Sequence, residues 1–159
     1  ANERMDWLVE KATELGVAAI QPLMSERSVL RLDAARAQKK QAHWQSIAVA
    51  ACEQCGRNRV PHVHAVASLS AWLERADESA PAGSRLGVLS FLPQATPLQA
   101  LAQDTDGLAF GITLLLGPEG GLSPGEESQA LARGFAPFTL GARVLRTDTA
   151  ALAALAVLT

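Results

Sequence analysis

Two glycine-bearing segments in the last third of the chain contain residue types suited to holding a small molecule. The first, Leu116-Gly117-Pro118-Glu119-Gly120-Gly121-Leu122-Ser123, directly follows an apolar run at 112–116. Its three glycines open backbone conformations closed to other residues and let a ligand approach the main chain. A P-loop is excluded because no Gly-Lys-Ser/Thr follows, and the glycine spacing fits a dinucleotide fingerprint poorly. The pattern predicts a ligand-binding turn, with a strand-to-helix turn that binds nothing as the alternative.

The second segment is Leu140-Gly141-Ala142-Arg143-Val144-Leu145-Arg146-Thr147-Asp148-Thr149-Ala150. Arg143 and Arg146 place cationic groups beside the expected cleft, and Thr147 or Asp148 can cap the helix that follows. A capped helix with solvated arginines is the alternative. Two such loops at the ends of neighbouring strands favour a pocket more than either loop does alone.

Hydrophobic periodicity predicts the elements that must position these loops. Helices are expected at 5–15, 38–55, 70–75, 97–102, 124–133 and 147–158, and strands at 17–24, 61–66, 86–91, 112–116 and 135–140. This alternation predicts an α/β fold with a largely parallel sheet flanked by helices. Ligands bind beyond the carboxyl ends of such strands, which directs attention to the loops after Phe91, Leu116 and Leu140.

The 159 residues suit a single domain, and their net charge of −2 gives no overall basic surface. Any RNA-binding surface must therefore be local or come from another domain or chain. No apolar run has the length of a membrane span and no signal-peptide pattern opens the chain, so a cytoplasmic protein is expected. The chain starts without an initiator methionine, and 152–159 is still helix-forming where it stops, which predicts a fragment of something longer.

Other residues that could do chemistry fit structural roles better. Cys52 and Cys55 lie within an expected helix without a second pair, so metal or redox use is disfavoured. His62 and His64 point to one face of an expected strand, but no third zinc ligand is in view, and no metal site is predicted. Packing at helical core spacing, rather than base stacking, is the expectation for Trp7, Trp44 and Trp72.

Together, the two glycine-bearing segments resemble the SPOUT superfamily of RNA methyltransferases. Gly-Pro-Glu-Gly-Gly at 117–121 is followed about twenty residues later by Leu-Gly-x-Arg-Val-Leu-Arg-Thr-Asp-Thr-Ala at 140–150. Within the superfamily, the chain is most similar to the bacterial small-subunit (16S) ribosomal RNA uridine-N3 methyltransferases, which the segments 4–17, 25–28 and 53–61 also resemble. Two departures are Asp148, where the family usually has glutamate, and a more apolar loop at 90–93.

The resemblance implies a fold and partners that periodicity and composition did not suggest. In this superfamily the C-terminal segment passes through a loop to form a deep trefoil knot, although chains seldom thread their own loops. The knot forms the pocket for S-adenosylmethionine. Relatives carry an N-terminal PUA or OB-like RNA-binding domain, which would lie ahead of the methyltransferase domain that spans 1–159 here. They form homodimers with each active site near the subunit interface.

The resemblance also implies roles for individual residues. Glu119 and Asp148 are candidate general bases, because uracil N3 must lose its proton to attack a methyl group. Glu119 could instead bind the methionine amino group, and Asp148 could simply cap a helix. Three arginines are expected to face the RNA: Arg27, Arg57 and Arg146. Arg146 is expected to lie within the catalytic centre. The alternative for Arg57 is that it closes a helix C-terminus. Residues assigned to the cofactor are Leu92, Leu116, Gly117, Pro118, Gly120, Gly121, Leu140, Gly141, Val144, Leu145, Thr149 and Ala150.

Three functions are compatible with these motifs. The leading one is S-adenosylmethionine-dependent methylation of uridine N3 in small-subunit ribosomal RNA. A SPOUT enzyme acting on another RNA position, such as a ribose 2′-hydroxyl, is the first alternative, and the segment 53–61 argues against it only by resemblance. A non-catalytic RNA-binding relative is the second, against which the intact Glu119, Arg146 and Asp148 argue.

Overall fold

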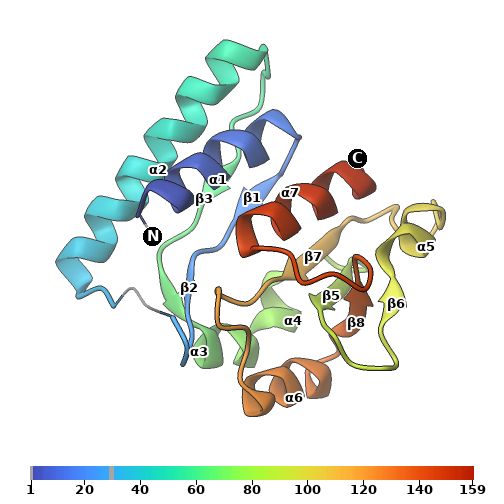
Figure 1. Cartoon of the computed structure of the whole chain (residues 1–159). Helices are drawn as coiled ribbons and strands as arrows, with labels where there is room; N and C mark the ends of the chain where they lie inside the picture. The colour runs from blue at the N-terminus through green and yellow to red at the C-terminus, as the bar shows by residue number, and fades with distance from the viewer. Residues whose placement is uncertain (1, 29–30) are drawn as a thin grey trace.

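The computed structural model describes residues 2–28 and 31–159, which form helices around parallel strands (Figure 1). The helices are α1 (Asn2–Glu14), α2 (Ala34–Cys55), α3 (Leu69–Glu74), α4 (Ala76–Ser79), α5 (Leu98–Ala102), α6 (Pro124–Ala132) and α7 (Thr147–Leu158). The strands are β1 (Ala19–Ile20), β2 (Leu23–Met24), β3 (His62–Val63), β4 (Ala67–Ser68), β5 (Arg85–Leu89), β6 (Thr96–Pro97), β7 (Ile112–Leu115) and β8 (Ala136–Thr139). Every strand pair in the described part of the chain is parallel, which confirms the predicted class.

The central sheet has the strand order β6-β8-β5-β7. Leu89 of β5 is aligned with Phe138 of β8, and Val88 of β5 with Leu115 of β7. On the other side of β8, Thr96 of β6 is also aligned with Phe138. The last strand of the chain thus lies between β5 and β6, and the segment that joins those two strands crosses the end of β8.

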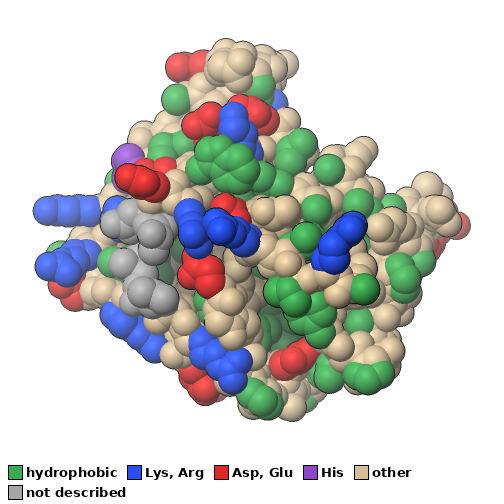
Figure 2. Space-filling model, in the orientation of Figure 1, with side chains coloured by type: hydrophobic (Ala, Val, Ile, Leu, Met, Phe, Trp, Pro, Cys, Tyr) green, Lys and Arg blue, Asp and Glu red, His purple; other side chains and the backbone are tan. Residues whose placement is uncertain are grey.

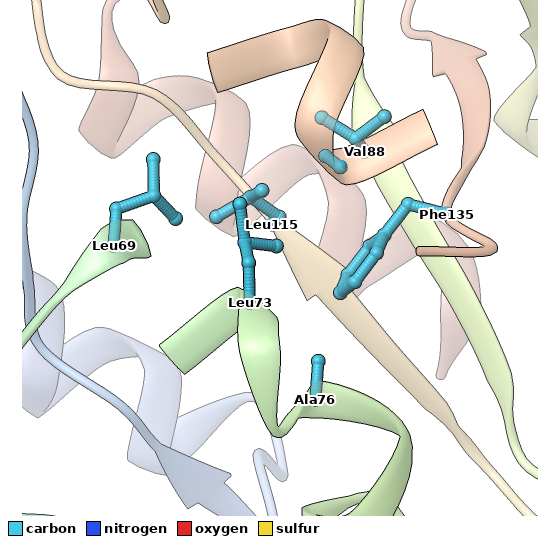
Figure 3. Packing of buried hydrophobic residues seen from close by; sticks show 7 residues of the cluster. Leu69, Leu73, Ala76, Val88, Leu115 and Phe135 are labelled. Atoms are coloured by element: carbon cyan, nitrogen blue, oxygen red, sulfur yellow. The ribbon is translucent and has the colours of Figure 1, made fainter. Parts of the chain in front are cut away.

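Helices cover both faces of this sheet. On one face, α3, α4 and α6 pack against β5 and β7 (Figure 3), and the buried residues there include Leu69, Leu73, Ala76, Val88, Leu115 and Phe135. On the other face, α5 and α7 bury Leu98, Leu101, Phe138 and Ala154. Leu114 and Leu115 of β7 belong to different clusters, as the alternation of side chains along a strand requires. The sheet is therefore held in place by apolar burial on both sides.

A separate apolar cluster joins α1 to α2 and β3. Trp44 is buried there, and its Nε1 donates a hydrogen bond to Asp6 Oδ1 at 3.1 Å, so the polar edge of the ring is satisfied. Trp72 is half-buried against the α3–α6 cluster. Trp7, in contrast, is 45% exposed, so its predicted core packing is wrong. Val9 and Ala12 occupy the buried stripe of α1, and Trp7 lies outside it.

The predicted strand at 17–24 is two short strands, because Pro22 interrupts it. Proline has no N–H to donate to a neighbouring strand. Gln21 fills the gap, since its Nε2 donates to the carbonyls of Pro22 at 2.9 Å and Ala65 at 2.7 Å. β1 therefore pairs with β3, and β2 with β4, in two small sheets. Of the predicted strand at 61–66, only β3 forms, and β4 follows beyond its end.

Most predicted helix boundaries are confirmed within one or two residues, and α7 matches its predicted range. α2 begins at Ala34 and not at 38, because the side chain of Asp33 caps it by accepting from the Arg36 N–H. The sequence prediction missed β4, β6 and α4. The two strands have two residues each and the helix has four, which is too short for periodicity to register.

Candidate active site

Three loops lie together at one edge of the central sheet. β8, β5 and β7 occupy adjacent positions and run parallel, so the segments after them, 140–146, 90–95 and 116–123, leave at the same edge. The predicted convergence of these loops is confirmed. In open parallel sheets this is the edge at which ligands bind.

The loop at 117–122 folds back so tightly that glycine is required at its start. A Cβ on Gly117 would lie 2.8 Å from the backbone nitrogen of Leu122 and 3.1 Å from the carbonyl carbon of Gly121. Gly121 has a φ of 76°, and its N–H donates to the Pro118 carbonyl at 2.8 Å. A φ in this left-handed region favours glycine. The tight fold of this loop therefore depends on glycine at positions 117 and 121. We call the folded main chain of residues 117–122 the cradle.

The end of this loop is anchored at the N-terminus of α6. Ser123 accepts a hydrogen bond from the Glu126 N–H at 3.2 Å, and Glu126 Oε1 accepts from the Ser123 N–H at 2.9 Å, which forms a capping box. The second oxygen of the buried Glu126 accepts from the Glu26 N–H at 3.1 Å. The segment 25–28 is thereby attached to the glycine-rich loop.

Arg27 makes a second attachment from the same segment. Its Nη1 donates to the Gly120 carbonyl at 3.1 Å and to the Leu122 carbonyl at 3.4 Å. The Gly121 and Ser123 N–H groups of the same two peptide units are bonded to Pro118 and Glu126, so both units are held at each end. Arg27 was predicted to contact RNA. That contact stays a prediction, because the guanidinium is bonded here to the predicted cofactor loop.

Glu119 is paired with a residue that the sequence analysis did not assign to the site. Arg4 of α1 donates from Nη1 to Glu119 Oε1 at 3.0 Å, and about half of each side chain is exposed. Arg4 lies in the segment 4–17, and the resemblance of that segment to the family was the signal that could have identified Arg4 as a site residue. The pair brings the N-terminal helix to the rim of the glycine-rich loop.

The loop at 140–146 is more open. Gly141 has a φ of 123°, and its N–H donates to Thr139 Oγ1 at 3.1 Å. Val144 is 82% exposed, and Arg143 and Arg146 are exposed as well. This loop meets the first one where Thr147 Oγ1 donates to the Gly117 carbonyl at 3.2 Å. The two predicted glycine-bearing segments therefore contact each other at this edge of the sheet.

The predicted capping of α7 by Thr147 or Asp148 is wrong. Arg146, and neither Thr147 nor Asp148, occupies the N-cap position, and its side chain makes no cap hydrogen bond. Thr147 instead bonds the facing loop, and the half-buried Asp148 accepts from the Thr149 N–H at 2.9 Å through Oδ1. Asp148 is thus located in the first helical turn beside both loops.

The loop after β5 has its own polar anchor. Ser90 is 7% exposed, and its hydroxyl accepts from the Leu92 N–H at 3.0 Å and donates to Glu127 of α6. Leu92, predicted to be a pocket wall, is half-buried, whereas Phe91 is 69% exposed. Sequence reasoning missed Ser90 and Glu127, which are about 37 positions apart and fall in different motifs.

Arg57 lies at the α1 end of the molecule and not in these loops. Its Nη1 donates to the carbonyls of Thr13 at 2.8 Å and Val17 at 3.1 Å, where α1 ends. This is the helix-closing role given as the alternative, although the helix is α1 and not the one that precedes Arg57. Its RNA contact also stays a prediction.

The described residues contain no group of three or more His, Cys, Asp or Glu side chains that could hold a metal ion. His62 and His64 stack edge to face with ring centroids 4.4 Å apart. Desolvation, and secondly the charge of His62, lower the pKa of His64 below its usual 6.5. Cys52 is buried in α2 and Cys55 is exposed, both as free thiols. Among the described helices, none combines the length and apolar character needed to cross a bilayer.

A parallel α/β sheet with a glycine-rich loop at the carboxyl edge of its strands is the architecture of a ligand-binding α/β domain. A family model described as an RNA methyltransferase domain matches residues 1–159, so the chain belongs to this family of RNA methyltransferase domains. Its relatives include ribosomal RNA small subunit methyltransferase E from Buchnera aphidicola, 35% identical over 99% of this chain, and from Bacillus subtilis, 34% identical over 99%. The chain spans 60% and 61% of these two relatives.

Solved structures give the same result. A ribosomal RNA small subunit methyltransferase E from Neisseria gonorrhoeae, bound to S-adenosyl methionine, is 40% identical with a TM-score of 0.83. A putative methyltransferase from Legionella pneumophila with bound cofactor SAM is 37% identical with a TM-score of 0.82. Both matches cover 98% of this chain and 60% of the other. The resemblance to small-subunit RNA methyltransferases inferred from the motifs is confirmed.

Proposed function

We propose that this chain is the catalytic part of an S-adenosylmethionine-dependent methyltransferase that modifies N3 of a uridine in small-subunit ribosomal RNA. The observation that carries the proposal is the cradle at 117–122, in which a Cβ on Gly117 would collide with the main chain. Such a surface suits an adenosine group bound by backbone atoms. Relatives with similar folds hold this cofactor, and an enzyme for ribosomal RNA would work in the cytoplasm.

The adenosine half of the cofactor would contact main-chain groups of all three loops. Leu92 would form one wall, and the joined loops the other two, since Thr147 bonds the Gly117 carbonyl. When bound, the cofactor supplies a sulfonium methyl group. The remaining proposed contacts are Leu116, Pro118, Gly120, Gly121, Leu140, Gly141, Val144, Leu145, Thr149 and Ala150.

The methionine end of the cofactor is a zwitterion, and the Arg4–Glu119 pair offers complementary charges. Glu119 would accept from the ammonium group, and the Arg4 guanidinium would donate to the carboxylate. Both groups are half-exposed, so they are accessible to a ligand at the rim. This gives Glu119 a binding role in preference to that of a general base.

Asp148 is then the candidate that takes the proton from uracil N3. It is half-buried at the start of α7, and among the described residues its side chain accepts one hydrogen bond, at Oδ1, so Oδ2 would face a substrate. The exposed Arg146, next to it in sequence, would face the RNA and its negative charge. Positioning of the two reactants would supply most of the rate enhancement.

We also propose the trefoil knot. The segment 90–95 joins β5 to β6, and β8 lies between those strands. Leu89 and Thr96 are both aligned with Phe138, so the connection spans the end of β8 at the level where the chain leaves it. Residues 140–146 would therefore pass through this connection, and the three loops would surround one pocket.

A homodimer would cover an apolar surface that α1 and α7 share. The helices contact each other, and α7 consists only of Ala, Leu and Val from 150 to 158. Ala154 is its one buried residue, and Trp7 of α1 is 45% exposed. A helix that is apolar on all sides usually needs a partner on more than one side.

Ribosomal RNA would meet the domain on the side of segment 25–40, which holds Arg27, Arg31, Arg36, Lys39 and Lys40. Figure 2 shows Lys and Arg side chains gathered over this side, whereas the half of the same face over α5 and β6 carries few charges. The relatives are longer than this chain, and we propose that an N-terminal RNA-binding domain supplies their remaining affinity.

A chimaera that joins this chain to the N-terminal part of the Bacillus subtilis relative tests the proposal. With labelled S-adenosylmethionine and undermethylated small subunits, mass mapping should find methyl at a uridine N3. Asp148→Asn should lower kcat with little change in KM for the cofactor, and Glu119→Gln should mainly raise that KM. Methyl on a ribose 2′-hydroxyl would support the other SPOUT activity, and no transfer by a folded, cofactor-binding chimaera would support a non-catalytic module.

A further inference from the structure

Ser90 and Glu127 form a contact that the proposed chemistry does not use. Ser90 is 7% exposed at the end of β5, and its hydroxyl donates a hydrogen bond to Glu127 Oε1. The same hydroxyl accepts from the Leu92 N–H at 3.0 Å, and the Ser90 N–H donates to the Phe138 carbonyl at 2.8 Å. One buried serine therefore connects β5, β8, α6 and the loop after β5.

Glu127 belongs to a helix whose position is set by the glycine-rich loop. Its N–H donates to the Ser123 carbonyl at 3.0 Å, and Ser123 closes the loop through its capping box with Glu126. Glu127 thus links the end of the loop at 117–122, through its backbone N–H, to Ser90 and the Leu92 N–H, through its carboxylate. Such hydrogen bonds fix the relative position of the segments that they join.

We propose that Glu127 is a positioning residue for the cofactor: through Ser90 it holds the loop at 90–92 at a fixed separation from the glycine-rich loop. The inference rests on the cofactor site proposed above. An ionised acceptor makes a stronger bond to a hydroxyl than a neutral one does. The loop needs this anchor because Phe91 is 69% exposed and contributes little packing of its own. When a loop is already held in its bound position, less conformational entropy is lost on binding, and the ligand binds more tightly.

Calorimetric titration of this chain with S-adenosylhomocysteine tests the inference. Ser90→Ala and Glu127→Ala should each raise Kd about five- to twentyfold, because each removes the same hydrogen bond to a charged group. Glu127→Gln keeps an acceptor oxygen for Ser90 and should raise Kd by about twofold. The double variant should bind no more weakly than the weaker single variant. Glu78→Ala, at an exposed position of α4, is the matched control and should bind as the unsubstituted chain does.

The outcomes separate three cases. Weakened binding with rescue by Glu127→Gln and a non-additive double variant supports the inference. Lower Tm values with an unchanged Kd would make the contact merely structural and overturn it, as would additive effects. No binding by the unsubstituted chain would instead overturn the proposed cofactor site. If Glu127→Ala does not fold, Ser90→Ala is compared with Glu127→Gln. A larger rise in Kd for Ser90→Ala supports the inference, and an unchanged Kd for Ser90→Ala overturns it.

Discussion

The loops at 117–122 and 140–146 leave the same edge of the sheet but are held in different ways. Main-chain groups of the first loop are bonded by the side chains of Arg27 and Thr147, which come from two other parts of the chain. The Ser123 N–H, just after the loop, is bonded by Glu126. The second loop has a local contact between Thr139 and Gly141, and its Val144 is 82% exposed. We infer that the first loop is a preformed wall and that the second closes over the ligand.

The largest expected effect comes from filling the preformed wall. Gly117→Ala places a methyl group 2.8 Å from the Leu122 nitrogen, so the main chain must shift. Cofactor Kd should rise about 10- to 100-fold, in line with the usual cost of overpacking. Gly125→Ala is the control, since the nearest atom to its Cβ would be Ser123 Oγ at 4.0 Å. Equal binding by both variants, measured by calorimetry, would contradict the tight cradle.

A smaller effect is expected when a support of the same wall is removed. Arg27→Ala frees the carbonyls of Gly120 and Leu122, and Kd should rise about three- to tenfold even without RNA. Arg36→Ala removes an exposed arginine whose Nε lies 3.8 Å from Asp33, and it should leave Kd unchanged. If Arg27→Ala lowers RNA affinity but leaves the cofactor Kd unchanged, Arg27 does not hold the loop at 117–122 in place. Its predicted RNA contact would then be supported.

In the open loop at 140–146, a substitution should weaken cofactor binding without lowering the stability of the fold. Val144→Ala removes two methyl groups that are almost fully solvated, so the Tm should stay within about 1 °C of the unsubstituted value. If Val144 closes over the ligand, Kd should still rise about two- to fourfold, because apolar contact is lost in the complex. If Val144→Ala lowers the Tm but leaves Kd unchanged, the loop at 140–146 supports the fold and does not contact the ligand, which contradicts the comparison.

The smallest effect is expected far from both loops. The pKa of His64 is lowered in the fold, so the unfolded chain binds more protons once the pH falls below about 6.5. Stability should therefore decrease as the pH drops through that range, by less than about 0.5 kcal/mol because the side chain is exposed. His64→Gln should remove this dependence in urea titrations between pH 7 and 5. Cofactor Kd should not follow the His64 titration.

The sequence predicted the α/β class, the parallel strands and the two loops because their signals are local. Glycine spacing, the apolar run at 112–116 and the Ser123 cap are each read within about ten residues. The contacts that hold the site could not be predicted, because they join distant residues: Arg4 with Glu119, Arg27 with Gly120, and Ser90 with Glu127. Such pairings depend on the packing of the whole chain, which periodicity does not encode.

Trp7 shows the same limit for the core. Its helical spacing resembles that of a packing residue, and yet it is 45% exposed. A single-chain pattern cannot distinguish a side chain that faces the core from one that faces another protein. The proposals of a knot, a cofactor and a dimer came from the family resemblance, because no local signal indicated them.

Amide chemical shifts of the labelled chain, recorded during titration with S-adenosylmethionine, test the three-loop site most directly. We predict saturable shifts concentrated in 90–95, 116–123 and 140–150, with larger changes at Val144 than at Gly121, because we infer that the open loop closes over the ligand. The outer face of α2, far from the site, should be unaffected. No shifts at saturating cofactor, or shifts centred outside these three loops, would contradict the account.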